Sequence, residues 1–346
     1  MANNIDGIVK CTIDLNSPAV SEESYSGLLI VGPGPKNGKI EGVKIYSDLA
    51  ALANSGFTEE DPIYLAAQTA LAQSPKPDKI YVATIAEGEE PTATVERAMG
   101  TDGWYFILPA GIEHTKYNAL AVYTETTEKM LGITLAHEEE SPIIQDGLMR
   151  THVWRLAGNQ TSTYDQYLHA AICARVASYT PGSETWAFKS LSLITAGVFD
   201  ETDALDAKKE NYYVCIAKKN ITQGGKVLGD EWIDTIRFRD WLKNKIQSNC
   251  YNVFIQNVKV PYTDAGIGLL ENALISALKE GQANGGIAPD SYDEDGNKIP
   301  GYETSAPLAS SLSAAQKKSR VLPNMKWSAY LAGAAHCVEI SGTLGY

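Results

Sequence analysis

The sequence lacks an excess of basic residues and has no long apolar run. It holds 29 Lys and Arg against 42 Asp and Glu in 346 residues, a formal net charge of -13. Proteins that bind duplex nucleic acid present a basic face to the phosphates, so this balance argues against nucleic acid as a partner. The longest apolar run, Tyr212–Ala217, is far shorter than the ~20 residues that a membrane-spanning helix needs.

The start of the chain, Met1–Asp6, shows neither the basic stretch nor the apolar segment of a secretory signal. We therefore expect a soluble chain made in the cytosol, with no membrane insertion. Cysteines are also few and scattered, at Cys11, Cys173, Cys215, Cys250 and Cys337. Their odd number and wide spacing argue against a disulfide framework and against a CxxC site.

The Gly32–Gly38 turn follows a short apolar run and invites comparison with a phosphate-binding loop. A Walker A loop requires Gly at position 33 and Ser or Thr at position 40, where this sequence has Pro33 and Ile40. Pro33 and Pro35 also remove two backbone N–H groups that would contact a phosphate. A nucleotide-dependent α/β enzyme that uses the Gly32–Gly38 turn is kept as the alternative function.

Other catalytic and metal-binding patterns are incomplete. Asp293–Asn297 resembles the acidic half of a calcium loop, but Tyr302 stands where a bidentate Glu is required. His137 and Glu138 lack the second His of an HExxH motif, because position 141 is Ser. We therefore expect no catalytic residue, no metal site and no cofactor.

Strand-like and helix-like segments alternate from Leu28 to about Ser178. We expect strands over 28–31, 79–85, 104–108, 132–136 and 152–156, and helices over 61–73, 92–99, 113–130 and 164–178. Such alternation is typical of an α/β layer with a largely parallel sheet.

The pattern changes after a polar stretch over 178–207. We expect a strand over 212–217 with a hairpin turn at Gly224-Gly225, and a helix over 231–248 capped by Asp230. A second helix begins at Thr263 or Asp264 and ends at Gly281, with four apolar residues at helical spacing, Ile267, Leu270, Leu274 and Leu278. A polar loop over 291–307 and a short helix over 309–320 follow.

Both ends of the chain alternate between apolar and polar residues, as strands do. The apolar positions are Val9, Cys11, Ile13 and Leu15 at one end and Val338, Ile340 and Leu344 at the other. These strands could be edge strands of one domain, or they could pair with an open sheet edge of a neighbouring subunit.

Several motifs in series carry a family resemblance: Trp232–Ile246, Val260–Ile267, Asn284–Pro289, Leu322–Ala329 and Leu331–His336. In this order and spacing they resemble the tail sheath-like proteins of contractile bacteriophages and of related phage-tail-like particles.

The resemblance implies a fold class that combines α+β and α/β parts. An inner sheath core domain of helices and a small mixed sheet, built from N- and C-terminal segments, would carry an inserted α/β middle domain. The expected divisions are an N-terminal arm strand at 1–20, an outer α/β domain at 21–200, an inner sheath core domain at 201–333 and a C-terminal arm strand at 334–346.

The resemblance further implies a structural subunit and not an enzyme. Such subunits stack as hexameric rings around an inner tube, and the sleeve contracts to drive the tube through a cell envelope. The implied partners are further copies of the chain, the inner tail tube protein, and the baseplate and tail terminator proteins. The implied location is a virion or phage-tail-like particle, assembled in the bacterial host cytoplasm.

The resemblance also suggests roles for particular residues. The seven apolar residues of the two terminal segments would form inter-subunit arm strands, and Lys317, Lys318 and Arg320 would face an acidic tube. The other interpretation of these three cations is a solvated helix end that favours the helix dipole. Residues 1–200 hold 13 basic and 25 acidic side chains, against 16 and 17 in 201–346, which suits an outer surface and an assembly core.

Overall fold

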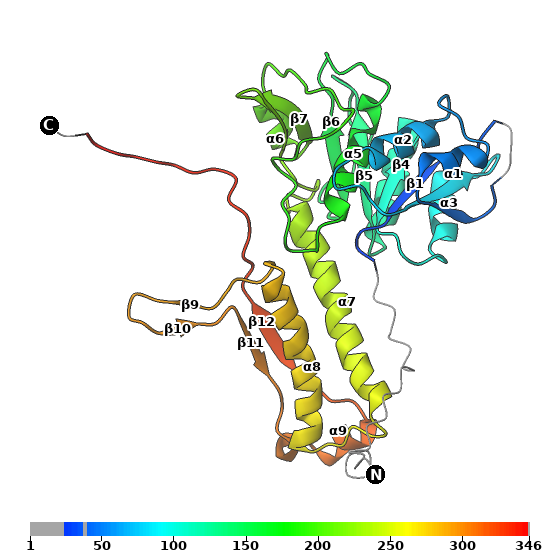
Figure 1. Cartoon of the computed structure of the whole chain (residues 1–346). Coiled ribbons are helices and arrows are strands. Elements are labelled where there is room, and N and C mark those ends of the chain that lie inside the picture. Colours follow the sequence, from blue (N-terminus) through cyan, green and yellow to red (C-terminus); the bar gives the residue numbers. More distant parts are fainter. Residues whose placement is uncertain (1–23, 37–39, 345–346) are drawn as a thin grey trace, which may run out of the picture.

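The computed structural model of the chain describes residues 24–36 and 40–344. It has an α/β part and a helical part, and the long helix α7 runs from one into the other (Figure 1). None of the helices in these residues is both long enough and apolar enough to cross a membrane.

The α/β part contains an eight-stranded sheet. Its strands are β1 (Leu28–Pro33), β2 (Val43–Tyr46), β3 (Ile80–Ile85), β4 (Phe106–Pro109), β5 (Met130–Leu135), β6 (Thr151–Arg155), β7 (Asn211–Ile216) and β8 (Lys219–Gln223). The order across the sheet is β2-β3-β1-β4-β5-β6-β7-β8. All pairs are parallel except the two outermost ones, β2 with β3 and β7 with β8. The expectation of a largely parallel α/β layer is confirmed.

Helices cover both faces of this sheet. They are α1 (Leu49–Asn54), α2 (Pro62–Leu71), α3 (Pro91–Ala98), α4 (Tyr117–Glu125), α5 (Leu168–Ala177) and the short α6 (Asp203–Ala207). Leu28 and Ile30 of β1 pack in a core with α2 and α5, and Leu29 and Val31 pack in a second core with α3 and α4. A strand buried on both faces is apolar at every position, which explains the continuous run in β1.

The sheet continues beyond residue 200, where the sequence suggests the end of the outer domain. Strand β7 pairs in parallel with β6, with Trp154 opposite Asn211 and Arg155 opposite Tyr212. The expected boundary therefore lies inside the α/β part. The polar stretch over 178–207 resembles a linker in composition, but its Trp186 is fully buried against the sheet.

The hairpin turn expected at Gly224-Gly225 lies earlier in the chain. Ala217 and Lys218 join β7 to β8, both with positive φ, at 48° and 64°. Such a turn usually carries Gly or Asn, so Ala217 and Lys218 do not indicate a turn at the level of sequence. Gly224 instead lies against Asn211, whose Oδ1 would be 2.5 Å from a Cβ at that position.

The helical part contains α7 (Ile233–Gln256), α8 (Asp264–Ala283) and α9 (Ala314–Ser319). Its strands are β9 (Ser291–Tyr292), β10 (Lys298–Ile299), β11 (Tyr302–Ser305) and β12 (Lys326–Ala329). They form two antiparallel pairs, β9 with β10 and β11 with β12, so the described residues show two small sheets and not one mixed sheet. Helix α8 packs along α7, and the β11–β12 pair lies beside α8 (Figure 1).

The helix boundaries differ in part from the expected ones. Thr263 caps α8 as expected, since its Oγ1 accepts a hydrogen bond from the Gly266 N–H at 3.2 Å. Gly281 is buried within α8 and does not end it. Asp230 does not cap α7, because its backbone is left-handed and its side chain pairs with Lys226.

Two histidines of the α/β core are buried and neutral. His169 Nδ1 lies 2.8 Å from Thr134 Oγ1, and its Nε2 lies 3.1 Å from the Pro109 carbonyl oxygen. His152 accepts a hydrogen bond from the indole N–H of Trp154 at 2.9 Å. Burial lowers the pKa of His169 to about 4. Burial, and then the charge of His169, lowers the pKa of His152 to about 3.

These histidines predict a loss of stability in mild acid. An unfolded histidine takes up a proton near pH 6.5, so between pH 6.5 and about 4 the unfolded chain binds more protons and the free energy of unfolding falls as the pH drops. At pH 5 the expected loss is about 2 kcal/mol for each histidine. Urea unfolding of the wild-type chain and of His169→Gln at pH 7 and pH 5 tests this. The variant should lose less stability on acidification than the wild type, and an equal loss in both would contradict the prediction.

Candidate assembly surfaces

The C-terminal segment leaves the body of the molecule and ends far from it (Figure 1). Val338, Ile340 and Leu344 are 76%, 87% and 101% exposed. The strand expected here is not formed in the single chain, because residues 332–344 have no strand partner among the described residues. Exposed apolar side chains that gather on one segment are typical of an interaction surface.

The other expected arm, with Val9, Cys11, Ile13 and Leu15, lies outside the described residues. A surface that could receive an arm is present in the β11–β12 sheet. Among the described residues each of these strands pairs only with the other, so the backbone groups on their outer edges could pair with another strand.

Lys317, Lys318 and Arg320 lie at the end of α9 and are exposed. Ser313 and Gln316 form a capping box at the start of this helix, which is far from the α/β part (Figure 1). No ion pair joins any of the three cations to another described residue. Lys317 and Arg320 line a groove of about 770 Å³ together with Lys259, whereas Lys318 does not.

An apolar surface on the last turns of α7 adjoins this groove. Tyr251, Phe254 and Ile255 are each about half exposed, and Val258 is fully exposed. Phe254 and Val258 line the groove, and Ile267, Leu270 and Leu322 are among its other apolar residues. Sequence reasoning missed this surface, because the expected helix ended at residue 248, whereas α7 continues to Gln256.

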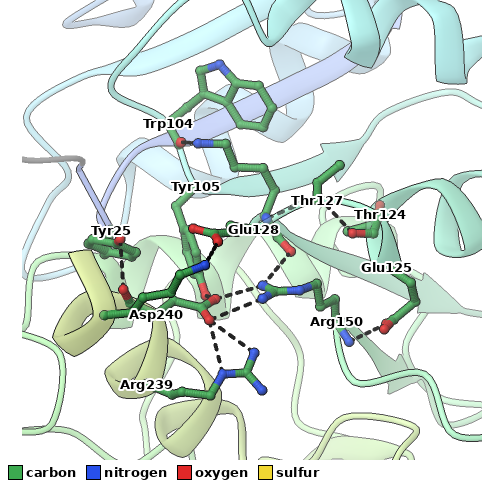
Figure 2. A network of polar contacts seen from close by, with 12 residues as sticks. Tyr25, Trp104, Tyr105, Thr124, Glu125, Thr127, Glu128, Arg150, Arg239 and Asp240 are labelled. Carbon is green, nitrogen blue, oxygen red and sulfur yellow. Dashed lines mark hydrogen bonds and ion pairs between the residues drawn. The ribbon is translucent and has the colours of Figure 1, made fainter. Parts of the chain in front are cut away.

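The first half of α7 is fixed to the α/β part through Asp240, which is buried (Figure 2). Arg150 donates two hydrogen bonds to its carboxylate, at 2.7 and 3.1 Å. The Tyr105 hydroxyl donates a third at 2.7 Å, and the Tyr25 hydroxyl donates to the Asp240 carbonyl oxygen at 3.0 Å. Burial, and then the Asp240 carboxylate, raises the pKa of Tyr105 well above its ordinary value.

Arg237, one turn before Asp240, makes a second buried connection. Its guanidinium pairs with Glu184 and donates to the carbonyl oxygens of Tyr25, Ala177 and Tyr179 at 2.9, 3.0 and 2.8 Å. Both side chains of the Arg237 and Glu184 pair are fully buried. The elements joined in this way are α7, the end of α5 and the segment before β1, so α7 and the α/β part form one packed unit.

The Gly32–Gly38 turn does not have the geometry of a phosphate loop. After β1 the next element is strand β2, so the turn does not lead into a helix as a phosphate loop does. Gly32 packs against β4, where a Cβ would lie 2.1 Å from the Ala110 carbonyl oxygen. The ends of β1 and β4, where sheets of this order bind ligands, are therefore closed by their own backbone. The geometry disfavours the nucleotide-dependent alternative.

The C-terminal part of the chain matches a known family. Residues 233–344 match the model of the E217 tail sheath protein gp31-like C-terminal domain. This part of the chain is thus similar to a tail sheath C-terminal domain. No curated protein matches the chain by sequence.

Solved sheath structures match nearly the whole tail sheath-like chain. A chain of the anti-feeding prophage (AFP) helical sheath in the contracted state has a TM-score of 0.71 at 13% identity, over 97% of this chain and 98% of that chain. The PVC sheath complex of an extracellular contractile injection system, also contracted, gives 0.70 at 13% identity, over 96% of each chain. The sheath tail protein Lin1278 from Listeria innocua gives 0.57 at 9% identity, over 83% of this chain and 90% of that chain. The resemblance to contractile tail sheath proteins is confirmed.

The buried network predicts unequal effects of two substitutions around Asp240. Asp240→Ala leaves Arg150, which is only 11% exposed, and Tyr105 without their shared partner. We expect a loss of about 3–5 kcal/mol in the free energy of unfolding. Arg239 contacts the same carboxylate but is 51% exposed, so Arg239→Ala should cost at most about 1 kcal/mol. Urea unfolding of the two variants tests this, and equal losses would contradict the role given to the buried side of the network.

Proposed function

We propose that the chain is a structural subunit of a contractile sheath. It polymerises as stacked hexameric rings around an inner tube, and the sleeve contracts to drive the tube through a cell envelope. The observation that carries this proposal is the match of residues 233–344 to a tail sheath domain, combined with the fold of contracted sheath subunits over nearly the whole chain. Baseplate and tail terminator proteins would cap the sleeve in a virion or phage-tail-like particle assembled in the host cytoplasm.

The surfaces left open in the single chain support this function. The exposed C-terminal segment and the open edges of the β11–β12 sheet are different surfaces, so a segment from one copy that pairs with an edge on the next makes a head-to-tail contact. Head-to-tail contacts close into rings or extend into helices. Main-chain pairing also depends on no single side chain, so subunits joined in this way can reorient without separating.

The roles of the α/β part and the helical part in this proposal are assigned from their charge and from their place in the molecule. The α/β part carries most of the acidic residues and forms the outer domain in this proposal, while the helical part forms the core near the tube. Lys317, Lys318 and Arg320 lie on α9 at the far end of the helical part and would meet an acidic tube surface (Figure 1). The free energy of contraction would come from additional interface buried between subunits in the contracted state.

The terminal arms predict how truncation affects assembly. We expect the purified full-length chain to form striated sleeves in negative-stain electron microscopy. A chain that lacks residues 1–15 should stay folded and soluble but form no sleeves, because it has lost the Val9–Leu15 strand. Circular dichroism and size-exclusion chromatography verify folding. Sleeves formed by the truncated chain would rule out the arm role, and small discrete oligomers of the full-length chain would rule out the sheath function.

The basic cluster predicts a specific defect in tube binding. Replacing Lys317, Lys318 and Arg320 together with Ala should abolish co-assembly with the tube protein while sleeves of the chain alone still form. The matched control replaces three other exposed cations of the α/β part, Lys208, Lys218 and Lys219, with Ala. Co-sedimentation measures the effect at low and moderate salt. If the variant without these three cations still co-assembles with the tube protein as the wild type does, the cluster does not bind the tube. It would then be a solvated helix end that favours the helix dipole.

A further inference from the structure

Beyond Ala332 the described part of the C-terminal arm keeps one point of contact with its own subunit, at His336. Backbone hydrogen bonds join the segment after β12 to the rest of the subunit as far as Ala332. The Ala332 N–H donates to the Gly286 carbonyl oxygen at 3.1 Å. Beyond this point, among the described residues up to 344, only His336 has a hydrogen bond or ring contact with the rest of the chain. Residues 337–344 are exposed.

The side chain of His336 lies in a site made by three residues of the α/β part and the start of α7. Its Nε2 is 2.8 Å from Thr185 Oγ1. Its ring packs edge-to-face against Trp232, with centroids 4.6 Å apart, and against Phe188, with centroids 5.5 Å apart. Edge-to-face pairs at these distances are favourable beyond the area that they bury. His336 therefore ties a segment that begins at β12 to the other part of the molecule.

The aromatic side of this site is held rigidly. Phe188 has a φ of 62°, a conformation that bulky residues rarely adopt. Its N–H donates to the Thr222 carbonyl oxygen of β8 at 2.8 Å, which fixes the backbone in this conformation. Backbone strain of this kind concentrates at functional sites. Trp232 is fixed by a bridge to Lys226, whose ammonium lies 5.0 Å from the indole ring.

We propose that His336 is the positioning residue of the C-terminal arm, fixing the point on its own subunit from which the arm leaves toward a neighbouring copy. The proposal rests on the sheath function. An arm that began at Ala332 would search a larger volume before it met the next subunit, and the entropy of closing that connection would oppose pairing. The anchor on Thr185, Phe188 and Trp232 shortens the free segment and sets its direction.

The surroundings of His336 favour the neutral form of its imidazole. Burial, and then the positive charge of Lys189, lowers the pKa of His336 below its ordinary value. A neutral imidazole can pack its ring against two aromatic side chains and still exchange a hydrogen bond with Thr185. The contacts with Thr185, Phe188 and Trp232 are therefore compatible with one another at neutral pH.

The test uses the native Cys337 as a reporter beside the anchor. A nitroxide is attached to Cys337 in a chain whose Cys11, Cys215 and Cys250 are replaced with Ser or Ala, while Cys173 is buried. Electron paramagnetic resonance of the monomeric fraction then measures mobility at the base of the arm. His336→Ala should raise the population of the mobile component about tenfold, as loss of a hydrogen bond and two ring contacts implies. Unchanged spectra would overturn the proposal.

Graded variants separate anchoring from a general structural defect. His336→Phe keeps the ring contacts and Thr185→Val removes only the hydrogen bond, so both should give intermediate mobility. Glu339→Ala changes an exposed arm residue that has no hydrogen bond or ion pair with another described residue, and it should match the wild type. Equal unfolding midpoints in urea verify that the fold is intact. An effect of Glu339→Ala as large as that of His336→Ala would also overturn the proposal.

Sleeve length gives the second readout. His336→Ala should form shorter and fewer sleeves than the wild type and than Glu339→Ala, and sleeves of wild-type length would overturn the role in assembly. If the wild-type chain forms no sleeves at all, the sheath function fails. The mobility measurement on the monomer still decides whether His336 anchors the segment.

Discussion

The buried charges of helix α7 are the constraint on which the rest of the arrangement depends. Asp240 and Arg237 are fully or almost fully buried, and each finds its partners only when α7 lies on the α/β part. Separating a buried charge from its partner costs several kcal/mol, so these contacts fix the helix in one position. The second half of α7 then extends away from the sheet and carries α8, α9 and the β11–β12 sheet with it (Figure 1).

Among the described residues, that arrangement leaves several surfaces of the single chain without partners. The last turns of α7 expose Tyr251, Phe254 and Ile255, the β11–β12 sheet has open edges, and the C-terminal arm exposes its apolar residues. Uncovered apolar surface and open strand edges are unfavourable in a monomer. A polymer of the chain would cover them, and the rigid attachment of α7 would transmit a rotation of the helical part to the α/β part.

The sequence predicts the fold correctly where the apolar residues of a segment are the ones that the structure buries. The apolar run of β1 and the spacing of Leu270, Leu274 and Leu278 led to correct elements. Prediction failed where tertiary contacts decide: Ala217 and Lys218 form a turn without Gly, and Arg237 and Asp240 resemble solvated helix positions. Of the candidate sites, the basic residues of α9 are exposed as expected, but a strand that pairs with another copy has no partner in a single chain.

An electron cryo-microscopy map of sleeves assembled from the full-length chain would show both the C-terminal arm and helix α7 in the assembly. We expect residues 337–344 of one subunit to lie as a strand along an open edge of the β11–β12 sheet of another. We also expect Asp240 and Arg237 to keep their contacts within each subunit. A map in which this segment folds back onto its own subunit, or in which α7 has separated from its sheet, would rule out this arrangement.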